Sequence, residues 1–363
     1  MNLLFISALV GGKYAGPTTS VPNQVFSQSK IDNVFWYNLT DIKCPMEKCN
    51  SIYHNINEYP SERLEDLPFP FSEPDLVIFE EFHKTKFIKF ANQLKKKKIP
   101  YIIVPRSQLT KQYMMNKKLK KKLGNFIIFN RFIKSAKAIQ YLSIKEESDS
   151  QEYNRGVEGF VIPNGIFTNS IKFDNEYKET FHGVFIGRYN IYQKGLDMLI
   201  EAVKELKNEL INEKIYVDLY GPDERTGNRS DVEKLVNEAG ISDIINVHGA
   251  AYEKEKQLIL EKADFFVHTS RYEGMPMSVL EALSYGLPCV VTKGTNMTEE
   301  IDKYSAGWNC EDNVNSIVMA LKKFIRDKSR LKQYSENALM LSKEYNWDKI
   351  AEVSHKIFLS YVE

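Results

Sequence analysis

Residues 265–292 read FFVHTSRYEGMPMSVLEALSYGLPCVVT, in which two largely apolar runs flank a polar turn and a helical stretch. The runs Phe265–His268 and Cys289–Thr292 are short, which is typical of strands that are buried on both faces of a sheet. Between them, Pro276 suits the first position of a helix, because the N–H that it lacks would have no partner there. The stretch therefore predicts a strand, a helix and a second, parallel strand.

The same alternation of strand and helix patterns continues along the chain of 363 residues. The strands that we expect are Leu3–Leu9, Asp75–Phe79, Tyr101–Val104, Ala138–Leu142 and Gly159–Ile162 in the first half, and Gly183–Ile186, Ile215–Tyr220, Ile244–Val247, Phe265–His268 and Cys289–Thr292 in the second. The clearest helix covers residues 195–210, whose apolar side chains fall on one stripe. Two successive sets of parallel strands predict an α/β fold with two doubly wound, Rossmann-like domains.

A turn and a polar segment mark the expected boundary between these domains. The turn is Pro163-Asn164-Gly165, and residues 168–180 after it show no apolar periodicity. We therefore expect an N-terminal domain over residues 1–166 and a C-terminal domain over residues 167–345. In open α/β sheets ligands bind beyond the carboxyl ends of the strands. We expect the two domains to face a central cleft that holds the functional site.

The composition is that of a globular chain. Apolar residues make up 43% of it, and no apolar run approaches the roughly 18 residues that span a bilayer. The apolar start, Leu3–Val10, lacks the basic segment of a signal peptide. The cysteines include one C-x4-C pair, Cys44 and Cys49, but no second pair to complete a zinc site. We therefore expect free thiols and a cytoplasmic location.

Positive charge is concentrated in one segment of the chain. The formal net charge is +1, but residues 84–137 contain 17 Lys or Arg and no Asp or Glu, against 32 basic and 48 acidic residues elsewhere. Such a segment predicts an anionic partner. A membrane surface, a nucleic acid and a polyanionic substrate are the three possibilities.

Gly11, Gly12 and Gly16 form a glycine-rich turn after the first expected strand. Pro17 stands where a Walker loop requires Lys, and the G-x-G-x-x-G spacing of dinucleotide-binding loops is absent, so neither ATP hydrolysis nor dinucleotide binding is favoured. Two interpretations remain open. The loop either lets its backbone approach a ligand or is an ordinary turn between a strand and a helix.

Two cations follow the first strand of the second half. Arg188 and Lys194 stand just before the helix expected over residues 195–210, at the carboxyl edge of the sheet. Arg binds a diphosphate through its planar fork, and Lys binds it as a point charge. The pair predicts a diphosphate site, with a surface salt bridge as the alternative.

Two glutamates bracket the helix that begins near Pro276. Glu273 precedes this helix, and Glu281 lies within its second turn. The helix start leaves three N–H groups unpaired, those of Met277, Ser278 and Val279. Such groups bind anions. A structural alternative exists for Glu281, because Ser278-x-x-Glu281 also matches a capping box.

Together these motifs resemble those of the retaining glycosyltransferases of family 4, which have the GT-B fold. The resemblance rests on the E-x7-E spacing of Glu273 and Glu281, on Gly187-Arg188 with Lys194-Gly195, and on the turn Ile162-Pro163-Asn164-Gly165. Residues 100–109 also resemble a segment of the first domain of these enzymes. Trp347-Asp348 stands where they begin a last helix that crosses back to the first domain, which implies such a helix over residues 346–363.

The resemblance also implies a role for each site residue. Arg188 and Lys194 would bind the donor diphosphate and Glu281 the ribose hydroxyls. Glu273 would bind the donor sugar, and with the two cations it forms the expected catalytic set. The other expected donor-binding residues are Gly274, Met275 and Pro276 at the sugar, His248 and Gly249 within residues 247–252 beside the base, Met277 and Ser278 at the helix start, and Gly11, Gly12 and Gly16 in the first domain.

One position departs from the family pattern. Many relatives have a His in the catalytic region of the first domain, whereas Pro105-Arg106-Ser107 occupies the corresponding loop here. Arg106 is therefore a candidate contact with the donor or the acceptor.

The resemblance implies a retaining glycosyltransferase that moves a sugar from a nucleotide sugar, most simply a UDP-sugar, to a glycan or lipid-linked glycan. Assembly of bacterial surface polysaccharide, capsule or O-antigen, is the expected setting. The chain has no D-x-D triplet, so we expect no metal ion and no cofactor. We also expect residues 84–137 to hold the protein on the inner, anionic face of the cell membrane.

Three alternatives remain. A nucleotide-sugar epimerase or a glycogen-type synthase would use the same fold. A nucleic-acid-binding protein would use the basic segment and the aromatic residues within it, Tyr101, Tyr113, Phe126 and Phe129, although these fall in apolar runs typical of a core. A non-catalytic partner subunit would be expected to lose Arg188, Lys194, Glu273 and Glu281, all of which are present.

Overall fold

The computed structural model describes residues 1–10, 16–116, 123–167, 178–223 and 228–362. The chain divides into two compact units. Unit 1 comprises Met1–Gly165 together with Trp347–Glu363, and unit 2 comprises Ile166–Asn346. Unit 2 is therefore inserted between the two segments of unit 1.

Unit 1 is built on a parallel sheet. Its described strands are β1 (Asn2–Ser7), β2 (Asn33–Asn38), β3 (Tyr53–Asn55), β4 (Leu76–Glu80), β5 (Tyr101–Val104), β6 (Ala138–Tyr141) and β7 (Gly159–Val161). They lie in the order β3-β2-β1-β4-β5-β6-β7, and every pair of neighbours is parallel. Strands β1 and β4 are central and are almost wholly buried, as continuous apolar runs require.

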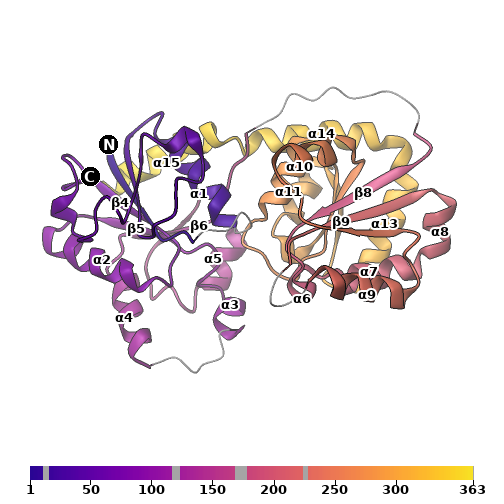
Figure 1. Ribbon diagram of the computed structural model, residues 1–363, viewed down its shortest axis with the longest axis horizontal. Coiled ribbons are helices and arrows are strands. Elements are labelled where there is room, and N and C mark those ends of the chain that lie inside the picture. Colours follow the sequence, from indigo (N-terminus) through magenta and orange to yellow (C-terminus); the bar gives the residue numbers. More distant parts are fainter. Residues whose placement is uncertain (11–15, 117–122, 168–177, 224–227, 363) are drawn as a thin grey trace. The chain divides into compact units, whose positions relative to one another are not determined.

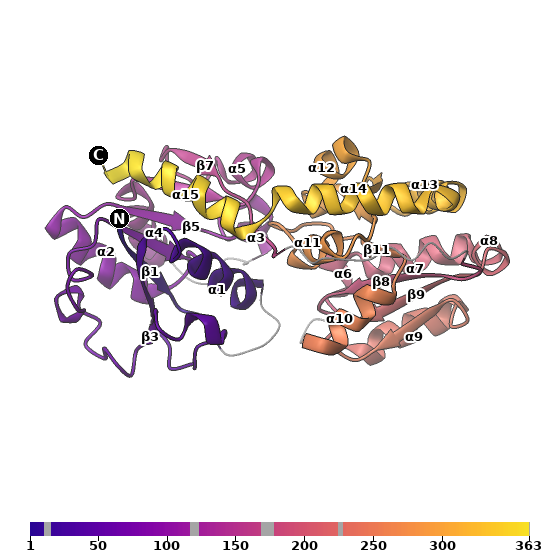
Figure 2. The ribbon, with the colours of Figure 1, turned by 90° about the horizontal axis from the view of Figure 1, so that it is seen from above.

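Helices cover this sheet. They are α1 (Gly16–Gln28), α2 (Thr85–Lys97), α3 (Lys111–Asn116), α4 (Leu123–Lys134), α5 (Ile144–Ser150) and α15 (Trp347–Val362). The last helix lies beside α1 (Figure 2). His355 on α15 contacts the buried carboxylate of Asp32 at 2.9 Å, and Lys30 pairs with Asp348 at 2.6 Å. These contacts fix α15 within unit 1.

Unit 2 contains a second parallel sheet. Its described strands are β8 (Phe181–Ile186), β9 (Ile215–Tyr220), β10 (Ile245–His248), β11 (Phe265–His268), β12 (Cys289–Thr292) and β13 (Gly307–Cys310). Their order is β10-β9-β8-β11-β12-β13, with parallel pairing throughout. The order reverses beside β8, which is where a doubly wound sheet places its ligand.

The helices of unit 2 lie on both faces of its sheet (Figure 1). They are α6 (Ile191–Lys194), α7 (Leu196–Glu205), α8 (Lys207–Asn212), α9 (Arg229–Ala239), α10 (Glu253–Lys262), α11 (Met277–Ser284), α12 (Thr298–Tyr304), α13 (Val314–Asp327) and α14 (Leu331–Glu344). Helices α7, α9 and α13 supply much of the apolar core on one face. The helix expected over residues 195–210 is instead divided between α7 and α8.

The two ends of unit 2 lie side by side. The N–H of Ile166 donates to the carbonyl of Tyr345 at 2.6 Å, and Ile166 forms a parallel bridge with Asn346. The strands and helices of both units confirm the expected α/β class with two doubly wound sheets. They also add β2, β3 and β13 to the strands that the sequence predicts.

Candidate functional site

The loops after β8, β11 and β12 meet at the carboxyl edge of the sheet in unit 2. The hydroxyl of Thr269, just after β11, lies 3.1 Å from the carbonyls of Lys194 and Gly195. Gly195 has a φ of +61°, and a Cβ there would lie 2.0 Å from the carbonyl oxygen of Thr269. Only glycine allows this close approach. The loop after β8 is thus held against the loop after β11.

This contact brings Lys194 and Glu273 together. The Nζ of Lys194, the last residue of α6, lies 2.5 Å from Oε1 of Glu273, and the two side chains are only 9% and 13% exposed. Asn190 caps α6, because its side chain accepts from the N–H of Gln193. The structure therefore joins a residue expected at the diphosphate to the residue expected at the sugar.

Glu273 has further polar neighbours on β11 and just after it. The hydroxyl of Ser270 donates to Oε1 at 2.9 Å, and Nε2 of His268 lies 3.6 Å from the same oxygen. Burial raises the pKa of the Glu273 carboxyl, but the charge of Lys194 and the contact with His268 outweigh burial and hold this pKa well below its usual range. Glu273 is therefore a carboxylate at neutral pH.

The backbone around Glu273 is fixed by residues that follow β12. The Nδ2 of Asn296 donates to the carbonyls of Glu273 and Gly274 at 2.5 and 3.0 Å. The hydroxyl of Thr292 donates to the carbonyl of Ser270 at 2.6 Å. A Cβ on Gly294 would lie 2.3 Å from that same carbonyl, so these two backbone segments need a glycine at the crossing. Residues 270–274 therefore have a defined conformation.

Helix α11 begins one residue later than the sequence predicts. Pro276 is the N-cap residue, with φ −75° and ψ 116°, because it precedes the first helical residue, Met277. The N–H of Val279, expected to remain unpaired, donates to the carbonyl of Pro276 at 3.1 Å. No side chain among the described residues caps this helix end, and the anion-binding role expected of the N–H groups of Met277 and Ser278 stays a prediction. Met275 is buried beside them.

Glu281 pairs with a lysine that sequence analysis did not identify. Both carboxylate oxygens accept from Nζ of Lys256 on α10, at 2.9 and 2.8 Å. The capping box with Ser278 is not formed, because the N-cap residue is Pro276 and Ser278 lies inside the helix. Lys256 lies one turn into the helix that follows residues 247–252. Its closeness to this segment, which we expect beside the base, is the feature of the sequence that could have pointed to it.

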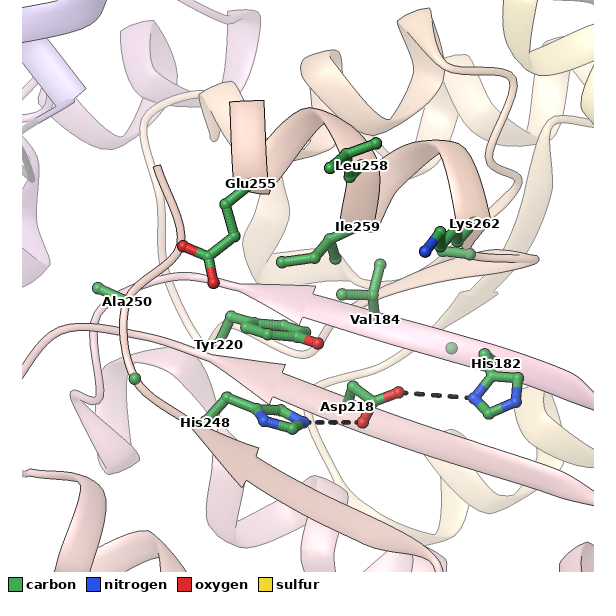
Figure 3. A pocket seen from close by; sticks show the side chains of 13 residues that line it. His182, Val184, Asp218, Tyr220, His248, Ala250, Glu255, Leu258, Ile259 and Lys262 are labelled. Carbon is green, nitrogen blue, oxygen red and sulfur yellow. Dashed lines mark hydrogen bonds and ion pairs between the residues drawn. The ribbon is translucent and has the colours of Figure 1, made fainter. Parts of the chain in front are cut away.

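An open pocket of about 780 Å³ lies between α10 and the strands β8, β9 and β10 (Figure 3). His248 and Gly249, expected beside the base, both line it. The ring of His248 stacks on Tyr220 with centroids 4.4 Å apart, and its Nε2 lies 2.9 Å from Oδ1 of Asp218. Leu258 and Ile259 of α10 form the apolar wall. The pocket therefore offers a flat ring and polar edges next to the loop after β10.

The remaining expected residues are less constrained. Arg188 is half-buried two residues beyond β8, where Gly187 donates to the carbonyl of Tyr220 at 3.0 Å. Gly11 and Gly12 lie outside the described residues. Gly16 is the first residue of α1 and is exposed, and a Cβ added to it would meet no atom of the described residues within 4 Å.

Arg106 lies in a closed cluster in unit 1. Its guanidinium is 5% exposed and contacts Glu80 Oε2 at 2.9 and 2.7 Å. Ser20, Gln24 and Asn164 accept its other hydrogens at 2.9, 2.7 and 3.1 Å. The guanidinium has five N–H groups and makes five contacts here, namely four hydrogen bonds and a further ion-pair contact with Glu80. This environment favours a structural role for Arg106 within unit 1. Its expected contact with the donor or the acceptor stays a prediction.

The same edge of unit 1 carries features that the sequence did not predict. Three residues other than glycine have a positive φ there, Glu81 at 91°, Arg106 at 49° and Ser107 at 67°. The buried carboxylate of Glu146 accepts from the N–H groups of Ser107 and Leu142 at 2.5 and 2.7 Å. Such conformations persist only where the surroundings hold them in place.

The described cations of residues 84–137 fall into two groups, while the lysines at 117, 118 and 120–122 lie outside the described residues. Five of them pair with carboxylates of the same unit: Lys84 with Glu81, Lys86 and Lys89 with Glu62, Lys97 with Glu73 and Arg106 with Glu80. Others are exposed near the ends of the neighbouring helices α2 and α4, namely Lys95, Lys96, Lys98, Arg131, Lys134 and Lys137 (Figure 1). Tyr101 is 2% exposed and packs in the core, which argues against base stacking by this residue.

Two properties of the described residues concern metals and membranes. In that part of the chain, no three or more His, Cys, Asp or Glu side chains are grouped so that they could hold a metal ion. No helix in the same residues is both long and apolar enough to cross a bilayer.

Known structures resemble the chain over nearly its whole length. HepE of Anabaena in complex with UDP superposes with a TM-score of 0.78 at 14% identity, covering 99% of this chain and 100% of HepE. WaaG, a glycosyltransferase involved in lipopolysaccharide biosynthesis, superposes with a TM-score of 0.65 at 15% identity, covering 98% and 99%. At this identity the likeness concerns the fold, and it confirms the expected GT-B class.

Curated relatives match shorter stretches. The putative colanic acid biosynthesis glycosyltransferase WcaL of Salmonella typhimurium is 27% identical over 141 residues, which are 37% of this chain and 34% of WcaL. Lipopolysaccharide 1,6-galactosyltransferase of Escherichia coli is 33% identical over 161 residues, 41% and 42% of the two chains. The chain thus spans between about a third and two fifths of the length of these two relatives.

Residues 167–340, nearly all of unit 2, match the model of a protein family described as glycosyl transferases group 1. The match covers Arg188, Lys194, Glu273 and Glu281. It confirms the family and the class of enzyme that the motifs predict. Residues 167–340 therefore belong to the glycosyl transferases group 1 family, and the chain as a whole has the GT-B fold.

Proposed function

We propose that this protein transfers a sugar from a nucleotide-sugar donor to a glycan or lipid-linked glycan acceptor, with retention of the anomeric configuration. The observation that carries the proposal is the buried pair of Lys194 and Glu273 at the carboxyl edge of unit 2. It joins a cation suited to a phosphate with a carboxylate suited to a sugar, next to the uncapped start of α11. A donor that contains both groups fits this juxtaposition.

The reaction places opposite charges on the two halves of the donor. As the bond between sugar and diphosphate breaks, positive charge develops on the sugar and negative charge on the leaving phosphate. Fixed donors aimed at that phosphate lower the barrier. Lys194, Arg188 and the N–H groups of Met277 and Ser278 would serve this role, and Glu273 would lie on the side of the sugar.

We propose UDP as the carrier of the sugar. HepE, whose fold covers the whole chain, was solved in complex with UDP. In our assignment Lys256 orients Glu281 toward the ribose hydroxyls, and the loop containing His248 and Gly249 flanks the base. The chain has no D-x-D triplet, so the protein's own cations would replace a metal ion at the diphosphate.

For the acceptor, the names of the relatives support a bacterial surface glycan. WcaL is named for colanic acid and the galactosyltransferase for lipopolysaccharide. A lipid-linked acceptor requires access to a membrane, and the exposed lysines near the ends of α2 and α4 supply charge for an anionic surface. Each cation near such a surface contributes about 1 kcal/mol. We propose a peripheral position on the inner face of the cell membrane.

The membrane assignment is tested by sedimentation with vesicles. We expect binding to anionic phosphatidylglycerol vesicles that weakens as salt is raised, and little binding to neutral phosphatidylcholine vesicles. Replacing Lys95, Lys96 and Lys98 by Gln should weaken the first without changing the second. Equal binding to both kinds of vesicle would remove the support for this surface.

The donor is tested by screening nucleotide sugars for thermal stabilisation and then for sugar transfer. A ligand at 100 times its dissociation constant stabilises the folded state by about 2.7 kcal/mol. We expect a UDP-sugar to stabilise the wild-type protein, and NMR of the product to show the anomeric configuration of the donor. Glu273→Gln should reduce turnover while UDP still binds. The absence of stabilisation and transfer with every nucleotide sugar would refute the proposal.

A further inference from the structure

A buried histidine lies directly behind Glu273. His268 is the last residue of β11 and is 0% exposed, with its ring between those of Phe185 and Phe266 at centroid distances of 5.7 and 6.1 Å. Its Nδ1 is buried and has no hydrogen-bond partner among the described residues. All of its polar contacts are therefore made through Nε2, on the side of the candidate site.

Ser270 connects this histidine to the carboxylate. The Oγ of Ser270 lies 3.1 Å from Nε2 of His268 and 2.9 Å from Oε1 of Glu273. The direct distance from Nε2 to Oε1 is 3.6 Å, which is too long for a hydrogen bond. The three side chains thus form a series in which the hydroxyl is the middle member.

The directions of the hydrogen bonds in this series follow from the charge of Glu273. An ionised carboxylate only accepts, so the hydroxyl of Ser270 must donate to Oε1. The oxygen of Ser270 then accepts, and Nε2 of His268 must carry the hydrogen that it receives. Burial and the nearby charge of Lys194 lower the pKa of His268 despite the opposing carboxylate, so the imidazole is neutral with its one hydrogen on Nε2.

The two oxygens of Glu273 consequently have different surroundings. Oε1 is held by Ser270 at 2.9 Å and by Lys194 at 2.5 Å. Oε2 has no hydrogen-bond partner within the described part of the chain, although the side chain is 13% exposed. Oε1 is the anchored oxygen, and Oε2 is the one left for a ligand.

We propose that His268 and Ser270 act as positioning residues that fix the carboxylate of Glu273 through Oε1 and present Oε2 to the donor sugar. This inference rests on the proposed function, because it assumes that Glu273 faces the sugar. The positioning of Glu273 by His268 and Ser270 adds to the contact that Lys194 makes with the same carboxylate. When Lys194 also binds a diphosphate, its charge is divided between the diphosphate and Glu273. The hydrogen bond from Ser270 to Glu273 is not divided in this way.

Four variants test the series. His268→Met removes both ring nitrogens and keeps an apolar side chain in the core, and His268→Gln restores an N–H donor on a side chain that can reach as far. Ser270→Ala removes the middle hydroxyl, and the double variant His268→Met/Ser270→Ala removes both. Ser354→Ala is the matched control, because its hydroxyl is also buried but donates only to Ile350 O on α15.

We expect His268→Met and Ser270→Ala each to lower kcat about tenfold, the effect of one hydrogen bond to a charged group. The KM for the donor and the affinity for UDP should stay within about twofold, because the lost contact matters most when charge develops on the sugar. His268→Gln should recover most of the rate. The double variant should be no slower than the slower single variant, because the residues act in series.

Three outcomes would overturn the inference. The first is an unchanged kcat in either single variant, and the second is a double variant slowed by the product of the two single effects. The third is no recovery of kcat in His268→Gln although its melting temperature equals that of the wild type. A general loss of packing would instead lower the melting temperature and leave kcat per folded molecule unchanged. If the wild type transfers sugar and the variants behave as it does, only the positioning role fails. If the wild type transfers no sugar, the proposed function fails as well.

Discussion

A buried pair of opposite charges lies at the carboxyl edge of each sheet, Arg106 with Glu80 in unit 1 and Lys194 with Glu273 in unit 2. In unit 1 the guanidinium donates four hydrogen bonds and makes a further ion-pair contact with Glu80, which is 0% exposed. In unit 2 the ammonium contacts one oxygen of Glu273, and the other oxygen has no partner within the described residues. The first pair is closed to ligands, and the second still has atoms that a ligand can use.

The pKa values of the two carboxyls move in opposite directions. Burial raises the pKa of Glu80 in spite of Arg106, since its Oε1 is buried without a partner among the described residues. Lys194 and His268 outweigh burial at Glu273 and lower its pKa. Burial of a charge pair therefore does not by itself indicate function. Hydrogen-bonding capacity that a ligand can reach is the better indicator, because Oε1 of Glu80 is buried whereas the side chain of Glu273 is 13% exposed.

Breaking the closed pair should have the largest effect on stability. Arg106→Met leaves the buried Glu80 without its counter-charge, which typically costs about 3–5 kcal/mol of unfolding free energy. Urea unfolding measures this loss, and the double variant Arg106→Met/Glu80→Gln should recover much of it because no isolated charge remains. A stable Arg106→Met variant with reduced turnover would contradict the structural role and restore the expected ligand contact.

Breaking the open pair should affect catalysis instead. Lys194→Ala should lower turnover by about 10²–10³, the usual effect of one preorganised electrostatic group. Its unfolding free energy should change less than that of Arg106→Met, because Ser270 still holds Glu273 at a partly exposed site. Arg188→Ala should show a similar loss of turnover. Near-normal turnover in both variants would show that these cations do not bind the diphosphate.

A third pair, Lys256 with Glu281, sharpens the comparison. If Glu281 binds the ribose, it contributes equally to the ground and transition states, so Glu281→Ala should raise the donor KM about tenfold with little change in kcat. Lys256→Ala should raise it less, because it only loosens the carboxylate. Steady-state kinetics at varied donor concentration measure both. A fall in kcat alone for Glu281→Ala would place this residue at the reacting centre.

The smallest expected effect is that of metal removal. If Lys194 and Arg188 neutralise the diphosphate, activity after treatment with EDTA should stay within about twofold of the untreated protein. The control is a parallel assay with added Mg²⁺ or Mn²⁺. Complete loss with EDTA and recovery with either ion would mean that the protein's own cations are insufficient.

The strands that could be predicted from the sequence are those with continuous apolar runs. β1, β4, β5, β11 and β12 lie in the interiors of their sheets, and such strands are apolar on both faces. β2 was not predicted because its apolar run is bounded by Asn33 and Asn38, and Asn is depleted in strands. β13 lies at a sheet edge with Asn309 in its middle, so it has only a weak pattern.

The candidate site was predictable where a local motif places a residue at a strand end. Lys194 and Glu273 are 79 residues apart in the chain, yet each follows a strand that feeds the same edge. The contacts of His268 and Lys256 were not predictable, because they depend on how one element is rotated against another. The hydrogen bonds of Arg106 within unit 1 were not predictable for the same reason, because their acceptors come from β4, α1 and the turn at Asn164.

The insertion of unit 2 within unit 1 also sets an order for biosynthesis. All of residues 166–346 are synthesised before α15, so the sequence of unit 2 is complete while unit 1 still lacks the helix that packs on α1. Domains generally fold as units during synthesis. A chain truncated after Asn346 would therefore contain all of unit 2 but an incomplete unit 1, and chaperones would meet exposed apolar surface on the half that was synthesised first.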